Sequence, residues 1–413
     1  MQPSPLGQPL RAAFPIFERS FAGRPAAFFD GPGGSQVPRP VIDAVAGYLA
    51  YHNANTHGAF QTSEETDRIL FGARERVAEL LGAAAPDEVV FGANMTTLTF
   101  AMSRALGAGW GPGDEAVVTQ LDHQANVAPW RRMAEDRGMT VREVPFIPET
   151  MQLDYAALEA ALSPRTRLVA VGAASNACGT INDVSRVTRL AREAGALSYV
   201  DAVHYAPHRL VDVQAMGCDF LACSAYKFFG PHVGILWGRQ ELLERVRPYK
   251  VPPAGDAAPD RWETGTLSHE GIAGTGAAVD WIAGLGGGAE QGGRRAALAR
   301  AYAAIEAHED SLVDRLLAGL RGIVGVRVHG PPAGAPRTPT LALTVEGHTP
   351  DEVAGWLAEE GIFVWNGNFY ATGVCEGLGL DTRGGLIRAG LAPYSTEEDV
   401  DRLVDELGRI AGS

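Results

Sequence analysis

Short apolar runs alternate with amphipathic stretches between about residues 67 and 240. Apolar runs of roughly four to eight residues separated by helical periodicity are typical of βαβ units, in which a mostly parallel sheet is buried on both faces. Ligands bind such sheets at the carboxyl ends of the strands, so the residues that follow each run are the first candidates for a functional site. The runs that we expect to form strands read EVVFGA, DEAVVTQ, RLVAVGAAS, LSYVDAV, DFLACSA and VGILWG.

A different pattern begins after the Pro- and Gly-rich stretch 251–266. An Ala-rich helical segment near 296–321 precedes a few short apolar runs, among them LALTVEG and IFVWN, and the helix-like segments TPDEVAGWLAEEG and STEEDVDRLVDELGRI. Such a mixture, with fewer strands, indicates an α+β unit. We therefore expect a large α/β domain over 25–270 and a smaller α+β domain formed by 1–24 and 271–413.

Composition and charge narrow the range of partners. The 413 residues are 46% hydrophobic and carry a formal net charge of −14, which disfavours nucleic acid and anionic lipid surfaces as ligands. The four cysteines are scattered without a CxxC pair, as expected for reduced thiols in a cytosol, and we predict no metal site. No apolar run approaches the roughly 20 residues that span a membrane, and the N-terminus does not read as a signal peptide. We expect a soluble, cytoplasmic protein.

Polar residues follow five successive predicted strands. One at a time, each has an ordinary explanation as a helix cap, a solvated loop histidine or a turn-forming asparagine. Because the carboxyl ends of parallel strands meet at one edge of a sheet, we expect the five positions to converge, and a cluster of this kind is the default hypothesis for an active site. The residues are Met95 and Thr96, His123, Asn176, Asp201 with His204, and Ser224 with Tyr226 and Lys227.

Lys227 stands within the apolar segment CSAYKFFGP. A buried ammonium group costs free energy unless it is paired or used chemically. Pyridoxal 5'-phosphate requires the groups gathered here: its aldehyde takes an amine, its pyridine nitrogen an acidic partner, its ring a flat neighbour, and its phosphate a helix N-terminus with hydroxyls. The pattern therefore predicts a pyridoxal-phosphate enzyme.

Five motifs carry a family resemblance: SNACGT, VDAVHYAPH, CSAYKFFGP, ETGT and IRAGLAPYSTEEDVDRL. They resemble those of the class V aminotransferase family of pyridoxal-phosphate enzymes over about residues 25–410. Within that family the chain is similar to the cysteine desulfurase-like branch, near the selenocysteine lyases and the isopenicillin N epimerase-like proteins. The resemblance implies an α/β protein of pyridoxal-phosphate fold type I, with a mostly parallel sheet of seven strands in the large domain, and a homodimer.

The resemblance also implies a role for each residue of the cluster. Lys227 forms the Schiff base and moves protons at Cα, Asp201 pairs with the pyridine nitrogen, and His123 stacks on the ring as a third catalytic group. The remaining cofactor contacts are those of Asn176 and His204 to the ring hydroxyl, of Met95, Thr96, Ser224 and Tyr226 to the phosphate, and of Thr266, in ETGT, to the phosphate of the partner subunit.

On the substrate side, the resemblance assigns the carboxylate to Arg388, because a guanidinium fork suits that group. The segments FFDGPGGS, with Gly34, and NANTHGAF, with His57 as the main contact, are expected to line the same side. Tyr370 occupies the position of the sulfur-accepting cysteine of cysteine desulfurases, and Cys375 lies five residues further on.

Two further positions depart from the cysteine desulfurases: Trp365 replaces an arginine, and Tyr226 replaces a histidine. Together with Tyr370, these departures count against persulfide chemistry. We therefore expect lyase or aminotransferase chemistry on an α-amino acid. True desulfuration through Cys375, epimerisation, and a catalytically inactive binding protein of the same fold remain alternatives. The cofactor contacts do not separate elimination, transamination and epimerisation, since all three labilise a bond at Cα.

Overall fold

A computed structural model describes residues 6–21, 23–290 and 292–412 of the chain. Its largest sheet has seven strands in the order β4-β12-β11-β10-β9-β5-β6, and β12 alone among them runs antiparallel to its neighbours. This confirms the predicted α/β class and the mostly parallel sheet of seven strands. The strands are β4 (Val89–Gly92), β5 (Glu115–Thr119), β6 (Thr140–Val144), β9 (Thr166–Gly172), β10 (Leu197–Asp201), β11 (Phe220–Ser224) and β12 (Gly234–Gly238).

Both faces of this sheet are buried, which is why its strands read as continuous apolar runs. Along β9, Leu168 and Ala170 belong to one apolar cluster and Val169 and Val171 to another, as the alternation of side chains across a strand requires. The first cluster is shared with α3 (Met95–Gly107) and α4 (Ala128–Arg137), and the second with helices of the opposite layer. These are α2 (Gln61–Leu81), α6 (Val184–Glu193), α9 (His269–Leu285) and α10 (Gly293–Leu320).

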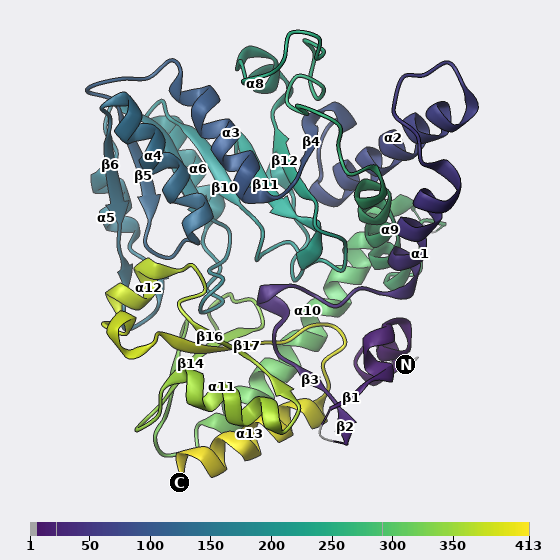
Figure 1. Ribbon diagram of the computed structural model, residues 1–413. Helices are drawn as coiled ribbons and strands as arrows, with labels where there is room; N and C mark the ends of the chain where they lie inside the picture. The colour runs from purple at the N-terminus through teal and green to yellow at the C-terminus, as the bar shows by residue number, and fades with distance from the viewer. Residues whose placement is uncertain (1–5, 22, 291, 413) are drawn as a thin grey trace.

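A second sheet lies below the first in Figure 1 and has four antiparallel strands in the order β13-β14-β17-β16. Its apolar face packs on the C-terminal part of α10 and on two further helices. The elements are β13 (Val326–His329), β14 (Thr340–Val345), β16 (Trp365–Gly367), β17 (Leu386–Gly390), α11 (Pro350–Glu359) and α13 (Glu397–Ala411).

The N-terminal segment joins the two sheets. Strand β3 (Ala27–Phe28) pairs in parallel with β15 (Ile362–Phe363), and the chain then crosses the edge of the second sheet and reaches the first (Figure 1). The division of the chain at residue 270 stays a prediction. Shorter elements complete the fold: β1 (Ser20–Phe21), β2 (Arg24–Pro25), β7 (Phe146–Ile147), β8 (Gln152–Leu153), α1 (Arg39–Gly47), α5 (Tyr155–Ala161), α7 (Val213–Met216), α8 (Gln240–Arg245) and α12 (Thr372–Gly377).

Among the described residues, no helix combines the length and the apolar character that a membrane crossing requires.

Candidate active site

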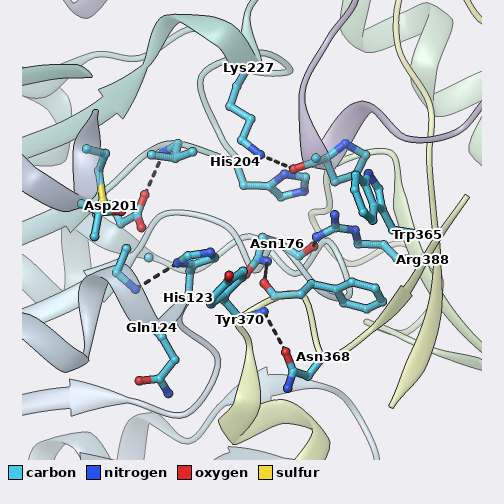
Figure 2. A pocket seen from close by; sticks show the side chains of 18 of the residues that line it. His123, Gln124, Asn176, Asp201, His204, Lys227, Trp365, Asn368, Tyr370 and Arg388 are labelled. Carbon is cyan, nitrogen blue, oxygen red and sulfur yellow. Dashed lines mark hydrogen bonds between the residues drawn. The ribbon is translucent and has the colours of Figure 1, made fainter. Parts of the chain in front are cut away.

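A cavity of about 1090 Å³ opens at the carboxyl ends of β11, β10, β9, β5 and β4, facing the second sheet. The polar residues predicted from all five strand ends line it together, because the strands that carry them run in one direction. Figure 2 shows Lys227 entering from one side, Asp201 and His123 at one end, and Arg388 with Trp365 at the other. The predicted residues that line the cavity are Met95, Thr96, His123, Asn176, Asp201, His204, Ser224, Tyr226, Lys227, Tyr370 and Arg388.

Lys227 ends the short 3₁₀ turn Ala225–Lys227 that follows β11, and its ammonium donates a hydrogen bond to the carbonyl of Pro32. Burial and the positive charge of Arg388 lower the pKa of Lys227 to about 7, against the opposing attraction of Asp201 and Asp30. The amine is therefore largely uncharged slightly above neutrality, as a nucleophile or a base must be. Lys250, the other lysine of the chain, pairs with Asp256 at 3.0 Å and does not line the cavity.

The N-terminal segment holds the turn that carries Lys227. The backbone N–H of Ser35 donates to the carbonyl of Tyr226 at 3.1 Å, and the Ser35 hydroxyl accepts from the N–H of Phe229 at 2.7 Å. Gly34 stands beside this turn, where a Cβ atom would lie 3.2 Å from the Tyr226 ring. Gly34 therefore supports the site from behind and is not among the residues that line the cavity.

Asp201 is the last residue of β10 and is 8% exposed. One carboxylate oxygen accepts the N–H of Val203 at 2.8 Å, and the side chain lines the cavity (Figure 2). Burial raises the pKa of Asp201 to about 6, although the Val203 bond and the charge of Lys227 oppose the rise. A cationic group brought into the cavity beside it would favour the ionised carboxylate.

His123 follows β5 and presents its ring to the cavity. Its Nδ1 accepts the N–H of Ala125 at 2.9 Å, so the neutral ring carries its proton on Nε2. Burial, together with the charges of Lys227 and Arg388, lowers the pKa of His123 to about 4 and keeps the ring neutral. The ring packs on that of Tyr370 with centroids 5.4 Å apart and an interplanar angle of 31°.

Asn176 Oδ1 and His204 Nδ1 are buried polar atoms at the cavity wall that have no hydrogen-bond partner among the described residues. The other half of each side chain is held: Asn176 Nδ2 donates to the carbonyl of Phe369 at 2.9 Å, and His204 Nε2 lies 3.0 Å from Thr338 Oγ1. Buried polar groups are nearly always satisfied in native proteins. Both atoms are therefore free to bind a ligand in the cavity.

The N-terminus of α3 borders the same cavity. Asn94 caps this helix by accepting the N–H of Thr97 at 2.9 Å, which leaves the exposed Thr96 facing the cavity in a position other than the cap. The N–H of Met95 donates to Ser224 Oγ at 3.3 Å. The N-terminus of α3 thus faces the cavity together with the hydroxyls of Thr96 and Ser224, and a helix N-terminus of this kind favours a bound anion.

Arg388 reaches the cavity from β17 of the second sheet and is 4% exposed. Its Nη1 donates to the carbonyl of Asn176 at 3.0 Å, and its guanidinium lies 4.3 Å from the centre of the Phe369 ring. Burial lowers the pKa of Arg388 to about 9, so the group is still charged at neutral pH. Its Nε has no partner among the described residues and can bind an anion such as a carboxylate.

Besides Gly34, three predicted residues lie outside this cavity. Thr266 is exposed and lines a second cavity of about 330 Å³, while His57 is exposed with its backbone N–H 3.2 Å from the Asp67 carboxylate. Cys375 is buried at 1% exposure within α12, and burial together with Asp381 and Glu376 raises its pKa to about 11.

Sequence reasoning did not assign roles to several residues at or behind the wall. Asp30 is a largely buried carboxylate. Burial raises its pKa to about 6, although the positive charges of Arg388 and Lys227 oppose the rise. Asp30 belongs to the segment FFDGPGGS, so a signal for it existed in the sequence. Pro32 lies in the same segment. The others had no such signal: Gln124, Thr338, Asn368 and Phe369.

Comparison with protein families decides the relationship, because the model of the aminotransferase class V family matches residues 27–403. The chain belongs to the aminotransferase class V family. The members of this family are pyridoxal-phosphate-dependent enzymes, so the predicted enzyme class and the predicted family are confirmed.

Individual class V relatives carry the name cysteine desulfurase. The chain is 33% identical to one from Dickeya dadantii over 97% of this chain and 96% of that protein, and 32% identical to one from Pectobacterium atrosepticum over 97% of each. The apo structure of a cysteine desulfurase from Thermococcus onnurineus matches with a TM-score of 0.88 at 26% identity, covering 98% of both chains. A cysteine desulfurase from Escherichia coli in an S-sulfonic acid form matches with a TM-score of 0.83 at 28% identity, covering 97% of both. The similarity to the cysteine desulfurase-like branch is thereby confirmed.

Proposed function

We propose that the cavity binds pyridoxal 5'-phosphate through Lys227 and acts on an α-amino acid whose carboxylate binds Arg388. The observation that carries this proposal is the meeting of Lys227, Asp201, His123 and Arg388 in one cavity. The unpartnered Asn176 Oδ1 and His204 Nδ1, and the anion site at the start of α3, fit the polar substituents of this cofactor.

Each part of the cofactor has a matching group. Asp201 would pair with the pyridine nitrogen and His123 would cover one face of the ring. Bound pyridoxal phosphate supplies an aldehyde that takes up an amine and a ring that accepts electron density from the substrate's Cα. The ring hydroxyl would be held by Asn176 and His204, and the phosphate by Met95 N–H, Thr96, Ser224 and Tyr226.

The chain's own residues then perform three tasks. Arg388 orients the substrate through its carboxylate. Lys227, with its pKa near 7, removes and returns the proton at Cα, since a base is most effective when its pKa is close to the working pH. Asp201 is ionised above about pH 6, and its carboxylate would stabilise a positive charge on a group bound beside it.

Lyase or aminotransferase chemistry fits the mouth of the cavity better than transfer of sulfur to the protein. A sulfur acceptor must present a thiolate to the substrate, whereas Cys375 is buried in α12 with a raised pKa and does not line the cavity. The names of the relatives support a second candidate, cysteine desulfuration through Cys375 after a movement of α12. Epimerisation would use the same cofactor contacts and is separated from the others by its product.

The active unit would be a homodimer in which Thr266 reaches the cofactor phosphate of the partner subunit. Thr266 is exposed, and large apolar side chains around α1 and α2 are exposed as well, including Leu49 at 51% and Tyr51 at 77%. Such a surface is typical of a contact between subunits. Sedimentation should give twice the chain mass, and Thr266→Ala should keep that mass while it weakens the retention of pyridoxal phosphate. A monomer that retains the cofactor equally well with threonine or alanine at position 266 would contradict this assignment.

Spectroscopy with product analysis tests the proposed function. Purified protein mixed with pyridoxal phosphate should develop a visible absorption band that changes on addition of its amino-acid substrate, and mass spectrometry of the product then names the reaction. Lys227→Ala should remain folded and show no such band. A binding protein without activity would keep the band but convert none of the amino acids offered.

A further inference from the structure

Trp365 lies directly opposite Arg388 in the antiparallel pair formed by β16 and β17. Directly opposed residues project from the same face of a sheet, with Cβ atoms about 4.5–5.5 Å apart. Both side chains line the cavity, and Figure 2 shows them side by side. A small molecule whose carboxylate binds Arg388 therefore has the rest of its structure close to the Trp365 indole.

The indole of Trp365 is held by the N-terminal segment. A Cβ atom at Gly33 would lie 2.2 Å from Trp365 Nε1, so the ring approaches the backbone there as closely as a glycine allows. The side chain nevertheless remains 48% exposed, because its other surface faces the mouth of the cavity. It is an apolar surface that is fixed in place and still open to a ligand.

Phe369 and Tyr370 extend this aromatic surface. Both have positive φ angles, 55° and 56°, a backbone conformation that persists in large side chains only where the surroundings impose it. The constraints are visible: Asn176 Nδ2 binds the carbonyl of Phe369 at 2.9 Å, and the N–H of Gln124 binds the carbonyl of Tyr370 at 2.7 Å. The result is a Tyr370 ring that is 69% exposed at the mouth.

Among the described residues of one chain, the charged groups that line the cavity offer no buried partner for a charged substrate side chain. Of the described residues that line it, Lys227 and Arg388 are the only lysine and arginine, and the proposed function uses both. The histidines there, His123 and His204, have lowered pKa values and are neutral. Asp381 is an exposed carboxylate at the rim, where solvent screens an ion pair.

We propose that Trp365, Phe369 and Tyr370 form the side-chain subsite, and that this subsite selects α-amino acids with an aromatic or large apolar side chain. The inference rests on the proposed function, since Arg388 must hold the carboxylate for the side chain to reach these rings. The volume of about 1090 Å³ is at the upper end of the usual range for small-molecule sites, so it admits a bulky substrate beside a cofactor.

Calorimetry with carboxylates that lack an amine tests the subsite without using the chemistry at Lys227. The protein, loaded with pyridoxal phosphate and reduced with borohydride, should bind 3-phenylpropionate at least tenfold more tightly than propionate or succinate. Trp365→Ala should weaken the binding of 3-phenylpropionate about tenfold, which corresponds to the loss of one aromatic contact. The same substitution should change the affinity for propionate less than twofold. Tyr370→Ala should act in the same direction by a smaller factor. Trp356→Ala is the matched control, because Trp356 is 39% exposed on α11 and does not line the cavity; it should change neither ligand.

Equal affinity for propionate and 3-phenylpropionate, tighter binding of succinate, or an unchanged affinity in Trp365→Ala would overturn the proposal. Turnover gives the second arm: kcat/KM should be higher for phenylalanine and leucine than for cysteine, aspartate and arginine. A preference for cysteine or for a charged amino acid would also overturn it. If the cofactor does not attach to Lys227 at all, the proposed function fails, and the same calorimetry on the unmodified protein still decides whether the aromatic subsite exists.

Discussion

The Arg388 guanidinium lies 4.3 Å from the centre of the Phe369 ring, while its Nη1 donates to the Asn176 carbonyl at 3.0 Å. The two contacts fix the plane of the guanidinium and leave Nε for a ligand. Asn176 also binds the carbonyl of Phe369, so the three residues restrain one another. Asn176, which follows β9 of the large sheet, thereby positions Arg388 on β17 of the second sheet.

Phe369→Ala should raise KM for the amino-acid substrate about two- to fivefold and leave kcat nearly unchanged. The ring contributes a cation–π contact of about 0.5–1 kcal/mol and orients a binding group without touching the bond that reacts. Steady-state kinetics measures the split between the two constants. Phe363→Ala, which removes an aromatic ring from β15 outside the cavity, should leave KM as it is. A kcat effect as large as the KM effect would contradict a purely positioning role.

Arg388→Ala should raise KM about a hundredfold, because hydrogen bonds to charged groups are worth about 1.5–3 kcal/mol. Arg383→Ala, an exposed arginine on the loop before β17, is the control and should behave as the unmodified enzyme does. An unchanged KM in Arg388→Ala would mean that the carboxylate binds elsewhere.

The pKa of Lys227, near 7, sets the pH dependence of cofactor attachment. Only the uncharged amine reacts, so the attachment rate should rise with pH, have its midpoint near 7 and level off above it, whereas an ordinary lysine would continue to gain rate beyond pH 9. Rapid mixing with pyridoxal phosphate at a series of pH values measures this profile.

Two substitutions should move that midpoint in opposite directions. Arg388→Ala removes a repelling cation, which should raise the pKa of Lys227, and Asp201→Asn removes an attracting anion, which should lower it. Lys250→Arg should leave the profile unchanged. Shifts of the same sign in the first two variants would show that Arg388 and Asp201 do not act on the pKa of Lys227 in opposite directions.

Cys375→Ala should leave turnover and any release of sulfide from cysteine unchanged within about twofold. The thiol is buried, carries a raised pKa and does not line the cavity. Sulfide assays measure the release of sulfide, and alkylation of the intact protein measures how accessible the Cys375 thiol is. Loss of sulfide release on this substitution would establish the desulfurase alternative.

The strand ends could be predicted from the sequence because the apolar runs are unusually clear and the rule for parallel sheets converts their order into proximity. Thr96, His123, Asn176, Asp201 and Lys227 were found in this way, and all line the cavity. That rule could not decide which polar residue caps α3. Asn94 does so, although Thr96 could have served as well.

Contacts between distant segments could not be predicted from periodicity. Pro32 and Lys227 are 195 residues apart, and Thr338 and His204 are 134 apart; they meet because β3 pairs with β15 and because the two sheets face each other. The left-handed backbone at Phe369 and Tyr370 even opposes local preference, since large side chains avoid that region. Tertiary contacts override the preference, so only the structure reveals it.

Attachment of the cofactor to Lys227 can be tested directly because the chain contains only two lysines. Protein incubated with pyridoxal phosphate, reduced with borohydride and digested should carry the cofactor mass on the peptide with Lys227, and the peptide with Lys250 should be unmodified. Lys227→Ala should lose the label and Lys250→Arg should retain it. Labelling of Lys250 alone, or no labelling of either peptide, would show that the cofactor does not attach to Lys227.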